Sequence, residues 1–304
     1  MTRSVLVPSS LTREAEDKRE ATRKLGYVAR AAVIFRVDRL VVFPDPGGDD
    51  GRFGDGFVST VLAFAATPPY LRKEAWGRRD ELEYVGILPP LRVRSQTGSG
   101  SDGSGSLRQG IVTEVGPDGR VRVNCGLQHP ISLPVPPSEE LEEGERVTIR
   151  VSSRRPVRAR IVDDPPPGFG VERATLDDAL AREDAGVRIA ASRHGEALTV
   201  ARLDRLVGRT ADDGFTVAFG APERGLPEIL DREPPGERTG AGDGADDGDG
   251  ADDGNEADEG EETIGEEESN ARFDLWLNTV PQQGSEVVRT EEAMFATLAP
   301  LTLE

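Results

Sequence analysis

Short runs of almost purely apolar residues limit the folds that this chain can adopt. The runs "GVRIAAS" at 186–192 and "FTVAFG" at 215–220 contain one charged side chain between them. A strand that is apolar on both faces is typical of a parallel sheet covered by helices on both sides. Two further runs of this kind, "SVLVPSS" at 4–10 and "RLVVF" at 39–43, are separated by helical spacing over 12–35. The sequence therefore predicts an α/β protein with a parallel sheet.

Three of the expected strands are each followed by a glycine-containing loop. The loops are "SRHGEAL" at 192–198, "GAPERGL" at 220–226 and, after the strand-like run "FDLWL" at 273–277, an amide-rich stretch at 278–290. The last one precedes a helix that we expect to begin with Thr290 as its N-cap and to end at Pro300. Such a loop can be a plain connection or a cradle whose backbone groups hold a ligand. Because ligands of open α/β sheets bind beyond the carboxyl ends of strands, three loops of this kind favour the cradle.

Residues 107–163 have a different character from the rest of the chain. Five short runs rich in β-branched residues are separated by Gly-, Pro- and Glu-containing turns. This pattern suggests a small barrel of the oligonucleotide-binding type, or a Greek-key barrel without a ligand. The stretch "RVSSRRPVRAR" favours contact with an RNA backbone, because it concentrates guanidinium groups in an otherwise acidic chain. The arginines concerned are Arg150, Arg154, Arg155, Arg158 and Arg160.

Two breaks in composition mark the borders of this region. The stretch at 95–106, "SQTGSGSDGSGS", has the composition of a flexible linker. The proline-rich stretch at 163–170, "DDPPPGFG", is expected to be stiff. The predicted organisation is a discontinuous α/β domain of residues 1–94 and 164–304, with the barrel of residues 107–163 inserted into it.

The net charge of −19 is concentrated in one segment. Residues 241–270 hold 14 acidic residues and no Lys or Arg, and without them the net charge is about −5. The segment has no hydrophobic period and like charges that repel, so we expect a disordered acidic insertion, bounded at 232–271, within the α/β domain. It does not fit a calcium-binding loop, because counting from Asp247 puts Asp252 where glycine is required. With three Lys against 34 Arg, the composition suggests a salt-accumulating halophile.

Several classes of protein are disfavoured by what the sequence lacks. No apolar run approaches 18 residues, so no membrane span is expected. The first residues lack the apolar core of a signal peptide, which indicates the cytoplasm. Cys125 is the only cysteine, so neither an internal disulfide nor a multi-cysteine metal site is possible within one chain. We interpret Cys125 as a small buried residue of a strand.

Four stretches together resemble a known family. They are "TPPYLRKEAWGRRDELEYVGILPPLRVRS", "SRHGE", "FGAPERGL" and "DLWLNTVPQQGSEVVRTEEA". In this order, and with an inserted barrel, they are similar to the archaeal and eukaryotic RNA methyltransferases of the SPOUT class. The resemblance covers nearly the whole chain except the linker and the acidic segment. It implies a trefoil-knotted parallel-sheet domain, a homodimer, and S-adenosylmethionine bound in the knot. It also implies an RNA substrate, and N3 of a uridine in large-subunit ribosomal RNA as the target.

The resemblance also assigns the three loops to the cofactor. The loop at 278–290 would be the knot loop, with Gly284 allowing close backbone approach and Pro281 stiffening the turn. The second wall would be the glycine loop of "FGAPERGL", and the third would be "SRHG". The residues assigned to S-adenosylmethionine are Ser192, Gly195, Phe219, Gly220, Gly225, Asn278, Thr279, Val280, Gln282, Gly284, Ser285, Val288 and Thr290.

Catalysis by such an enzyme would be mainly positioning, and no metal is expected because the sulfonium of the cofactor carries the leaving group. Uracil N3 must lose a proton, and Arg193 and Arg289 are the candidates for stabilising the resulting anion. Each could instead make a salt bridge at the surface or at a dimer interface. His194 is either a proton acceptor or an exposed loop residue. Two other functions remain open: a non-catalytic RNA-binding or ribosome-assembly factor, and a methyltransferase for another base or a ribose 2′-hydroxyl.

Overall fold

The computed structural model describes residues 1–48, 52–54, 56–93, 106–136, 140–154, 156–231 and 273–303. The predicted acidic insertion at 232–271 lies outside the described residues, as does the predicted linker except for its last residue. Arg155 and the side chain of Arg154 also fall outside them.

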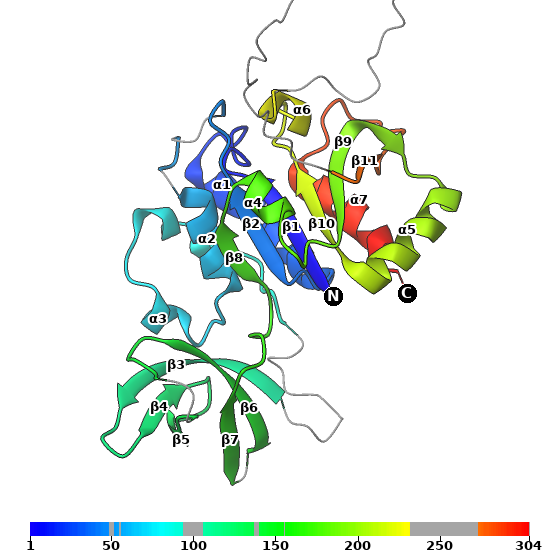
Figure 1. Ribbon diagram of the computed structural model, residues 1–304. Coiled ribbons are helices and arrows are strands. Elements are labelled where there is room, and N and C mark those ends of the chain that lie inside the picture. The colour runs from blue at the N-terminus through cyan, green and yellow to red at the C-terminus, as the bar shows by residue number, and fades with distance from the viewer. Residues whose placement is uncertain are drawn as a thin grey trace, which may run out of the picture.

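The larger part of the molecule is a six-stranded sheet in the order β11-β9-β10-β1-β2-β8, in which every neighbouring pair is parallel. This confirms the predicted parallel sheet (Figure 1). All six residues of β10 are buried, which is why this strand has no polar face. The strands are β1 (Thr2–Pro8), β2 (Arg39–Phe43), β8 (Gly170–Arg173), β9 (Val187–Ala197), β10 (Gly214–Phe219) and β11 (Leu275–Asn278).

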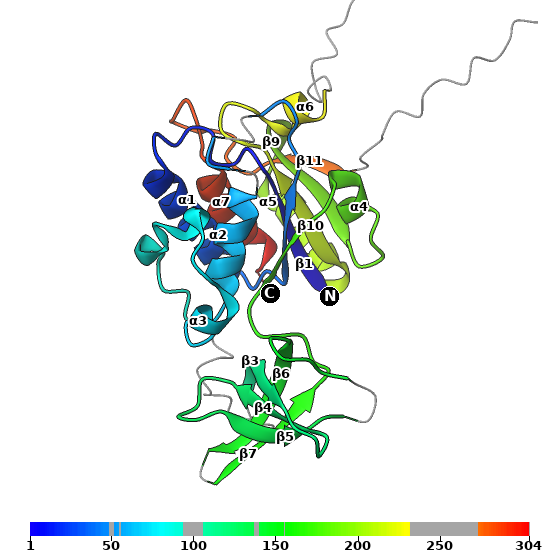
Figure 2. The same ribbon diagram turned by 90° about the vertical axis from the view of Figure 1, so that its left-hand side faces the viewer.

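Helices cover both faces of this sheet, as Figure 2 shows. Alternate residues of β1 illustrate the arrangement, because Val5 and Val7 join one hydrophobic cluster while Leu6 joins the other. The first cluster includes α1 (Lys18–Ile34), α2 (Phe57–Ala66), α5 (Val200–Asp213) and α7 (Thr290–Leu301). The second includes α4 (Leu176–Leu180) and α6 (Leu226–Ile229). Within the described residues, no helix is long and apolar enough to cross a membrane.

Three helix boundaries differ from the prediction. The first helix begins at Lys18 rather than near residue 12, because the Asp17 side chain caps it by accepting a hydrogen bond from Glu20 N at 2.7 Å. Thr290 is not the N-cap of α7 but its first residue, since its hydroxyl donates to the carbonyl of Gly220 at 2.9 Å. Pro300 does not end α7, which continues to Leu301.

The second sheet is antiparallel, with five strands in the order β5-β4-β3-β6-β7. It follows the short helical segments α3 (Arg72–Ala75), η1 (Asp80–Leu82) and η2 (Val85–Ile87), and it precedes β8. The outer strands β5 and β7 contact each other, so the sheet is a nearly closed barrel around its own hydrophobic cluster. Cys125 is fully buried there, as predicted, although it directly follows β4 rather than belonging to a strand, and burial raises the pKa of its thiol. The strands are β3 (Ser106–Val115), β4 (Arg120–Asn124), β5 (Ile131–Pro134), β6 (Arg146–Arg154) and β7 (Val157–Val162).

Polar contacts join the barrel to the rest of the molecule near the end of α2. The hydroxyl of Thr67 accepts hydrogen bonds from Arg146 Nη2 at 3.0 Å and from Trp76 Nε1 at 2.9 Å. Close by, the Tyr70 hydroxyl donates to the carbonyl of Gln109 at 3.0 Å, and burial raises the pKa of Tyr70 to about 12. These partly buried bonds link the barrel to the α/β unit.

Candidate functional site

A cavity of about 470 Å³ lies at the carboxyl ends of β9, β10 and β11, and we call it the edge cavity. Its walls come from the three predicted loops together with the first turns of α7. The three stretches therefore meet at one edge of the sheet, as the sequence predicted. Of the residues assigned to a cofactor, the cavity is lined by Ser192, Phe219, Gly220, Gly225, Asn278, Thr279, Val280, Val288 and Thr290.

The first wall is not a loop but an irregular part of β9. Trp276 of β11 pairs with Ala190, whereas the next residue, Leu277, pairs with Glu196, so the residues between bulge out of the ladder. Within this bulge, the carbonyl of Arg193 accepts a hydrogen bond from the side chain of Asn278 at 2.9 Å. A Cβ on Gly195 would lie 2.6 Å from the backbone nitrogen of Leu277. Gly195 thus allows the bulge to pack on β11, and it does not line the cavity.

The second wall is a tight turn between β10 and α6. Ala221 and Arg224 form a bridge across it, and Glu223 adopts a left-handed conformation with φ of 58°. A Cβ on Gly220 would lie 2.8 Å from the Cα of Gly225, so glycine is required for the turn to close. The bond from the Thr290 hydroxyl to Gly220 ties this wall to the start of α7.

The third wall is the loop at 278–290, which is held by hydrogen bonds within the loop and to α7. The hydroxyl of Thr279 bonds to that of Thr297 on α7 at 2.8 Å, and the Ser285 hydroxyl donates to the carbonyl of Val287 at 2.9 Å. A Cβ on Gly284 would meet no atom within 4 Å. The close backbone approach expected at Gly284 is therefore not seen, and neither Gly284 nor Gln282 or Ser285 lines the cavity.

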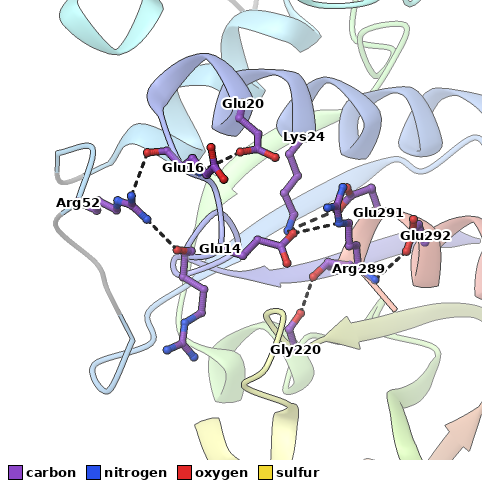
Figure 3. Close-up of polar contacts among 11 residues, drawn as sticks. Glu14, Glu16, Glu20, Lys24, Arg52, Gly220, Arg289, Glu291 and Glu292 are labelled. Atoms are coloured by element: carbon purple, nitrogen blue, oxygen red, sulfur yellow. Dashed lines mark hydrogen bonds and ion pairs between the residues drawn. The ribbon is translucent and has the colours of Figure 1, made fainter. Parts of the chain in front are cut away.

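The two candidate catalytic arginines are placed differently. Arg193 lines the edge cavity, and its Nε donates to Nε2 of His194 at 3.1 Å. His194 also lines the cavity. Arg289 does not; it turns towards Glu14, with its Nε 3.5 Å from a carboxylate oxygen (Figure 3). The structure thus shows Arg289 in the salt bridge that the sequence left open as its alternative role.

Arg289 belongs to a partly buried group of charges between α1 and α7 (Figure 3). Lys24 is its centre: its side chain is 5% exposed, it bonds to Glu14, and its Nζ lies 3.8 Å from Glu291 Oε2. Burial raises the pKa of Glu291 above its usual value, and the attraction of Lys24 only partly opposes this. The group fixes the first turn of α7, from which Thr290 reaches the edge cavity.

Arg224 and Asp45 were not found by the sequence reasoning. Arg224 lines the edge cavity, and its Nε lies 3.0 Å from both carboxylate oxygens of Asp45, a fully buried residue. Asp45 also accepts a hydrogen bond from the hydroxyl of Ser10. The pair joins the turn after β10 to the segment after β2. A usable signal existed, because both residues lie just beyond the carboxyl ends of predicted strands.

Of the predicted RNA-contacting arginines, the three whose side chains the structure describes lie on the barrel and do not line the edge cavity. Arg158 and Arg160 are exposed on β7. Arg150 pairs with Arg160 across the two strands, and its Nη2 is 2.8 Å from a carboxylate oxygen of Asp164. We call Arg150, Arg158 and Arg160 the arginine face.

Comparison with known proteins identifies relatives over nearly the whole chain. Residues 2–301 match the model of a family described as "Putative RNA methyltransferase". An uncharacterized protein of Haloarcula marismortui is 67% identical over 304 residues, covering 100% of this chain and 99% of that protein. An uncharacterized protein of Halobacterium salinarum is 66% identical over 303 residues, covering 100% of this chain and 99% of that protein. The human 28S rRNA (uridine-N(3))-methyltransferase is 29% identical over 336 residues, covering 99% of this chain and 77% of that protein.

Proposed function

Because this chain belongs to the RNA methyltransferase family that its residues 2–301 match, we propose that it transfers a methyl group from S-adenosylmethionine to N3 of a uridine in large-subunit ribosomal RNA. The observation that carries the proposal is the edge cavity, which two loops and the irregular part of β9 form at one edge of the parallel sheet. The printed activity of the human relative supports the choice of uridine N3.

The edge cavity fits S-adenosylmethionine in size and chemistry. About 470 Å³ lies within the range of pockets for small-molecule ligands. Apolar side chains such as Leu277, Val280 and Ala293 offer a surface for a flat adenine ring. Glu223, Glu228 and Glu286 also line it, and carboxylates suit the ribose hydroxyls and the positive charges of this cofactor. Within the described residues, no group of His, Cys, Asp and Glu is suited to hold a metal ion.

When bound, the cofactor would supply a methyl group carried on a sulfonium. After transfer of the methyl group, the sulfonium sulfur becomes a neutral thioether. The chain's own residues would hold the acceptor in line with that methyl group. Arg193 would stabilise the negative charge that develops on uracil as N3 loses its proton. A guanidinium can only donate hydrogen bonds, so His194 Nε2 accepts the bond from Arg193 Nε. Because the lone pair of Nε2 is engaged in this bond, His194 is disfavoured as the base that removes the N3 proton.

We also propose that the chain is a member of the SPOUT class, with the segment around 278–290 forming the knot and two chains forming a homodimer. The barrel would be the oligonucleotide-binding element that presents the arginine face to the RNA backbone.

The direct test is a two-stage assay in molar KCl. Equilibrium dialysis first measures binding of S-adenosylmethionine, and labelled methyl transfer to unmodified large-subunit ribosomal RNA is then followed by nucleoside analysis. The proposal expects binding and label in 3-methyluridine. Binding of RNA without any cofactor binding would favour a non-catalytic RNA-binding factor, and label in another nucleoside would move the target atom.

A further inference from the structure

Arg224 lies in the wall of the edge cavity, and a buried carboxylate holds its side chain in place. The Nε of Arg224 is 3.0 Å from both carboxylate oxygens of Asp45, which is fully buried. The same carboxylate accepts a hydrogen bond from the hydroxyl of Ser10, another buried residue. Because a buried carboxylate is strongly destabilising without its partner, Asp45 keeps the guanidinium in this position.

This group of residues comes from the carboxyl ends of three adjacent strands. Ser10 follows β1, Asp45 follows β2, and Arg224 lies in the turn after β10. The strands are neighbours in the order β10-β1-β2 (Figure 1). The backbone after β2 adds a further contact, because a Cβ on Gly47 would overlap Nη2 of Arg224. The guanidinium is therefore held between the turn after β10 and the segment after β2.

A guanidinium held in this way differs from that of Arg193, the other arginine discussed for the edge cavity. The side chain of Arg193 is exposed, and its Nε donates to its chain neighbour His194. The side chain of Arg224 is 21% exposed and pairs with a buried acid 179 positions away. A donor that is fixed before the reaction stabilises a developing charge without being reorganised at that moment. Of the two, Arg224 is the better preorganised donor.

The order of the strands indicates which part of the edge cavity Arg224 serves. Asp45 follows β2, so Arg224 reaches from the end of β10 across β1, away from β9 and β11. The loop at 278–290, which the proposed function assigns to the cofactor, follows β11 on the other side. A guanidinium suits an anion, whereas the sulfonium and the ammonium of S-adenosylmethionine are positive. Both arguments favour the acceptor base as the partner of Arg224.

We infer that Arg224 donates a hydrogen bond to a carbonyl oxygen of the target uracil, and that Asp45 is the residue that positions it. The inference rests on the proposed function and adds a second donor to the same site. N3 of uracil lies between two carbonyl groups, so the negative charge left by loss of its proton spreads over both oxygens. Arg193 on one wall and Arg224 on the next would each donate to one of them.

The step that these donors assist is balanced by solvent. The N3–H bond breaks, the proton passes to water, and the electron pair stays on the uracil ring. N3 then forms a bond to the methyl carbon, while the electron pair of the broken C–S bond stays on sulfur. Arg224 keeps its own protons throughout, because a guanidinium is not deprotonated in proteins.

The experiment removes the guanidinium without leaving a buried charge unpaired. Arg224→Gln combined with Asp45→Asn replaces both charged groups by amides, and Arg224→Lys keeps a positive charge but loses the planar fork. The matched control is Arg39→Gln combined with Asp184→Asn. Arg39 also pairs with both oxygens of its partner, at 3.1 and 2.8 Å, but it begins β2 and so lies at the opposite edge of the sheet. Circular dichroism and equilibrium dialysis of S-adenosylmethionine report on folding and on cofactor binding.

Single-turnover methyl transfer is measured in molar KCl with saturating ribosomal RNA made with uridine or with 5-fluorouridine, whose N3 proton is more acidic. With uridine, the double variant of Arg224 and Asp45 should be slower than the wild type by about 100-fold or more, as for loss of a donor to a developing anion. Arg224→Lys should fall between them. The control pair should transfer normally, and all variants should keep their cofactor affinity. With 5-fluorouridine the deficit of the double variant should shrink several-fold, because a more acidic base loses its proton more readily.

Two results would overturn the inference and leave the proposed function intact. An equal deficit with both RNAs would show a distorted cavity, which slows the two reactions alike. Weaker binding of S-adenosylmethionine with a normal rate at saturation would show that Arg224 binds the cofactor instead.

A third readout does not depend on methyl transfer. Fluorine NMR follows the ionisation of 5-fluorouridine 5′-monophosphate in the presence of excess protein and S-adenosylhomocysteine. The wild type should lower the pH at which the bound base ionises, and the double variant should not. His194 and the glutamates that line the edge cavity are the same in both proteins, so their own titration cancels. If the wild type transfers no methyl group, the proposed function fails, and this titration alone decides whether Arg224 holds the base.

Discussion

The edge cavity and the arginine face of the barrel differ in what holds their side chains in place. The walls of the edge cavity are fixed by internal contacts, such as the bond from Thr290 to Gly220 and the pairing of Arg224 with the fully buried Asp45. On the arginine face, Arg158 and Arg160 are exposed on β7. Preorganised buried groups give strong, geometry-dependent effects, whereas exposed charges give effects that are modest and sensitive to salt. Substitutions in the two regions should therefore differ in size and in their response to salt.

The largest effect is expected for Gly220→Val in the edge cavity. The new side chain would collide with the backbone of Gly225, which a flexible neighbour cannot relieve. Equilibrium dialysis should find no measurable binding of S-adenosylmethionine, while circular dichroism shows a folded protein. Gly284→Val is the matched control, because a Cβ there meets no atom within 4 Å, and it should bind normally. Loss of binding in Gly284→Val but not in Gly220→Val would mean that the loop at 278–290, and not the turn after β10, makes the close contact with the cofactor.

The second effect concerns the two arginines that the sequence could not rank. Arg193→Ala should slow methyl transfer by about 100- to 1000-fold with cofactor affinity retained, as for loss of one donor to a developing anion. Arg289→Ala should slow it by only a few-fold, because Arg289 turns to Glu14 and does not line the cavity. Single-turnover kinetics with saturating RNA measures both. If Arg289→Ala proves to be the slower variant, Arg289 must leave its salt bridge when RNA binds.

A smaller effect is expected on the arginine face. Arg158→Ala combined with Arg160→Ala should weaken RNA binding by about tenfold or less at molar salt, and it should do so for any RNA sequence. Because each phosphate contact to a single strand contributes about 0.7 to the slope of log K against log salt, the slope should fall by about 1.4. Arg150→Ala is the comparison, and it should change the slope less because Arg150 is already paired with Asp164. Unchanged binding in the double variant would remove the arginine face from the RNA interface.

The smallest effect is a pH dependence of stability from Glu291. Burial raises the pKa of this carboxyl, so its stabilising contribution is fully present below its unfolded pKa of about 4.3 and is lost as pH rises through the folded pKa. Glu291→Gln does not titrate at this position, so the free energy of unfolding of the variant relative to the wild type should rise as the pH is raised from 4 to 7. Urea unfolding at several pH values measures it. A relative stability that falls over this range would mean that the attraction of Lys24 outweighs burial.

The sequence predicted the repetitive parts of this structure well. Strands buried on both faces must be apolar throughout, so β1, β2, β10 and the first half of β9 could be located from their apolar runs, whereas the second half of β9 was predicted as a loop. The barrel strands followed from short β-type runs between turns. The meeting of the three stretches 192–198, 220–226 and 278–290 at one edge followed from the geometry of parallel sheets, although the first of them is part of β9 rather than a loop. These features depend on local patterns that repeat along the chain.

Features that depend on one particular tertiary partner were not predictable in this way. Threonine is a residue type typical of N-caps, yet the hydroxyl of Thr290 donates to the carbonyl of Gly220, 70 positions away. Arg224 and Asp45 are separated by 179 positions. The bulge in β9 arises because Leu277 of β11 pairs with Glu196, and this shift in register cannot be predicted from the hydrophobic pattern of either strand. The orientation of Arg289 likewise depends on Glu14, a residue of a different loop.

The measurement that tests the account most directly is nucleoside mass spectrometry of large-subunit ribosomal RNA from cells with and without the gene. Cells lacking it should lose one 3-methyluridine, and a copy of the wild-type gene or of Gly284→Val should restore it. Gly220→Val should not. A modification pattern that is the same with and without the gene would contradict the assignment of the edge cavity to methyl transfer onto ribosomal RNA.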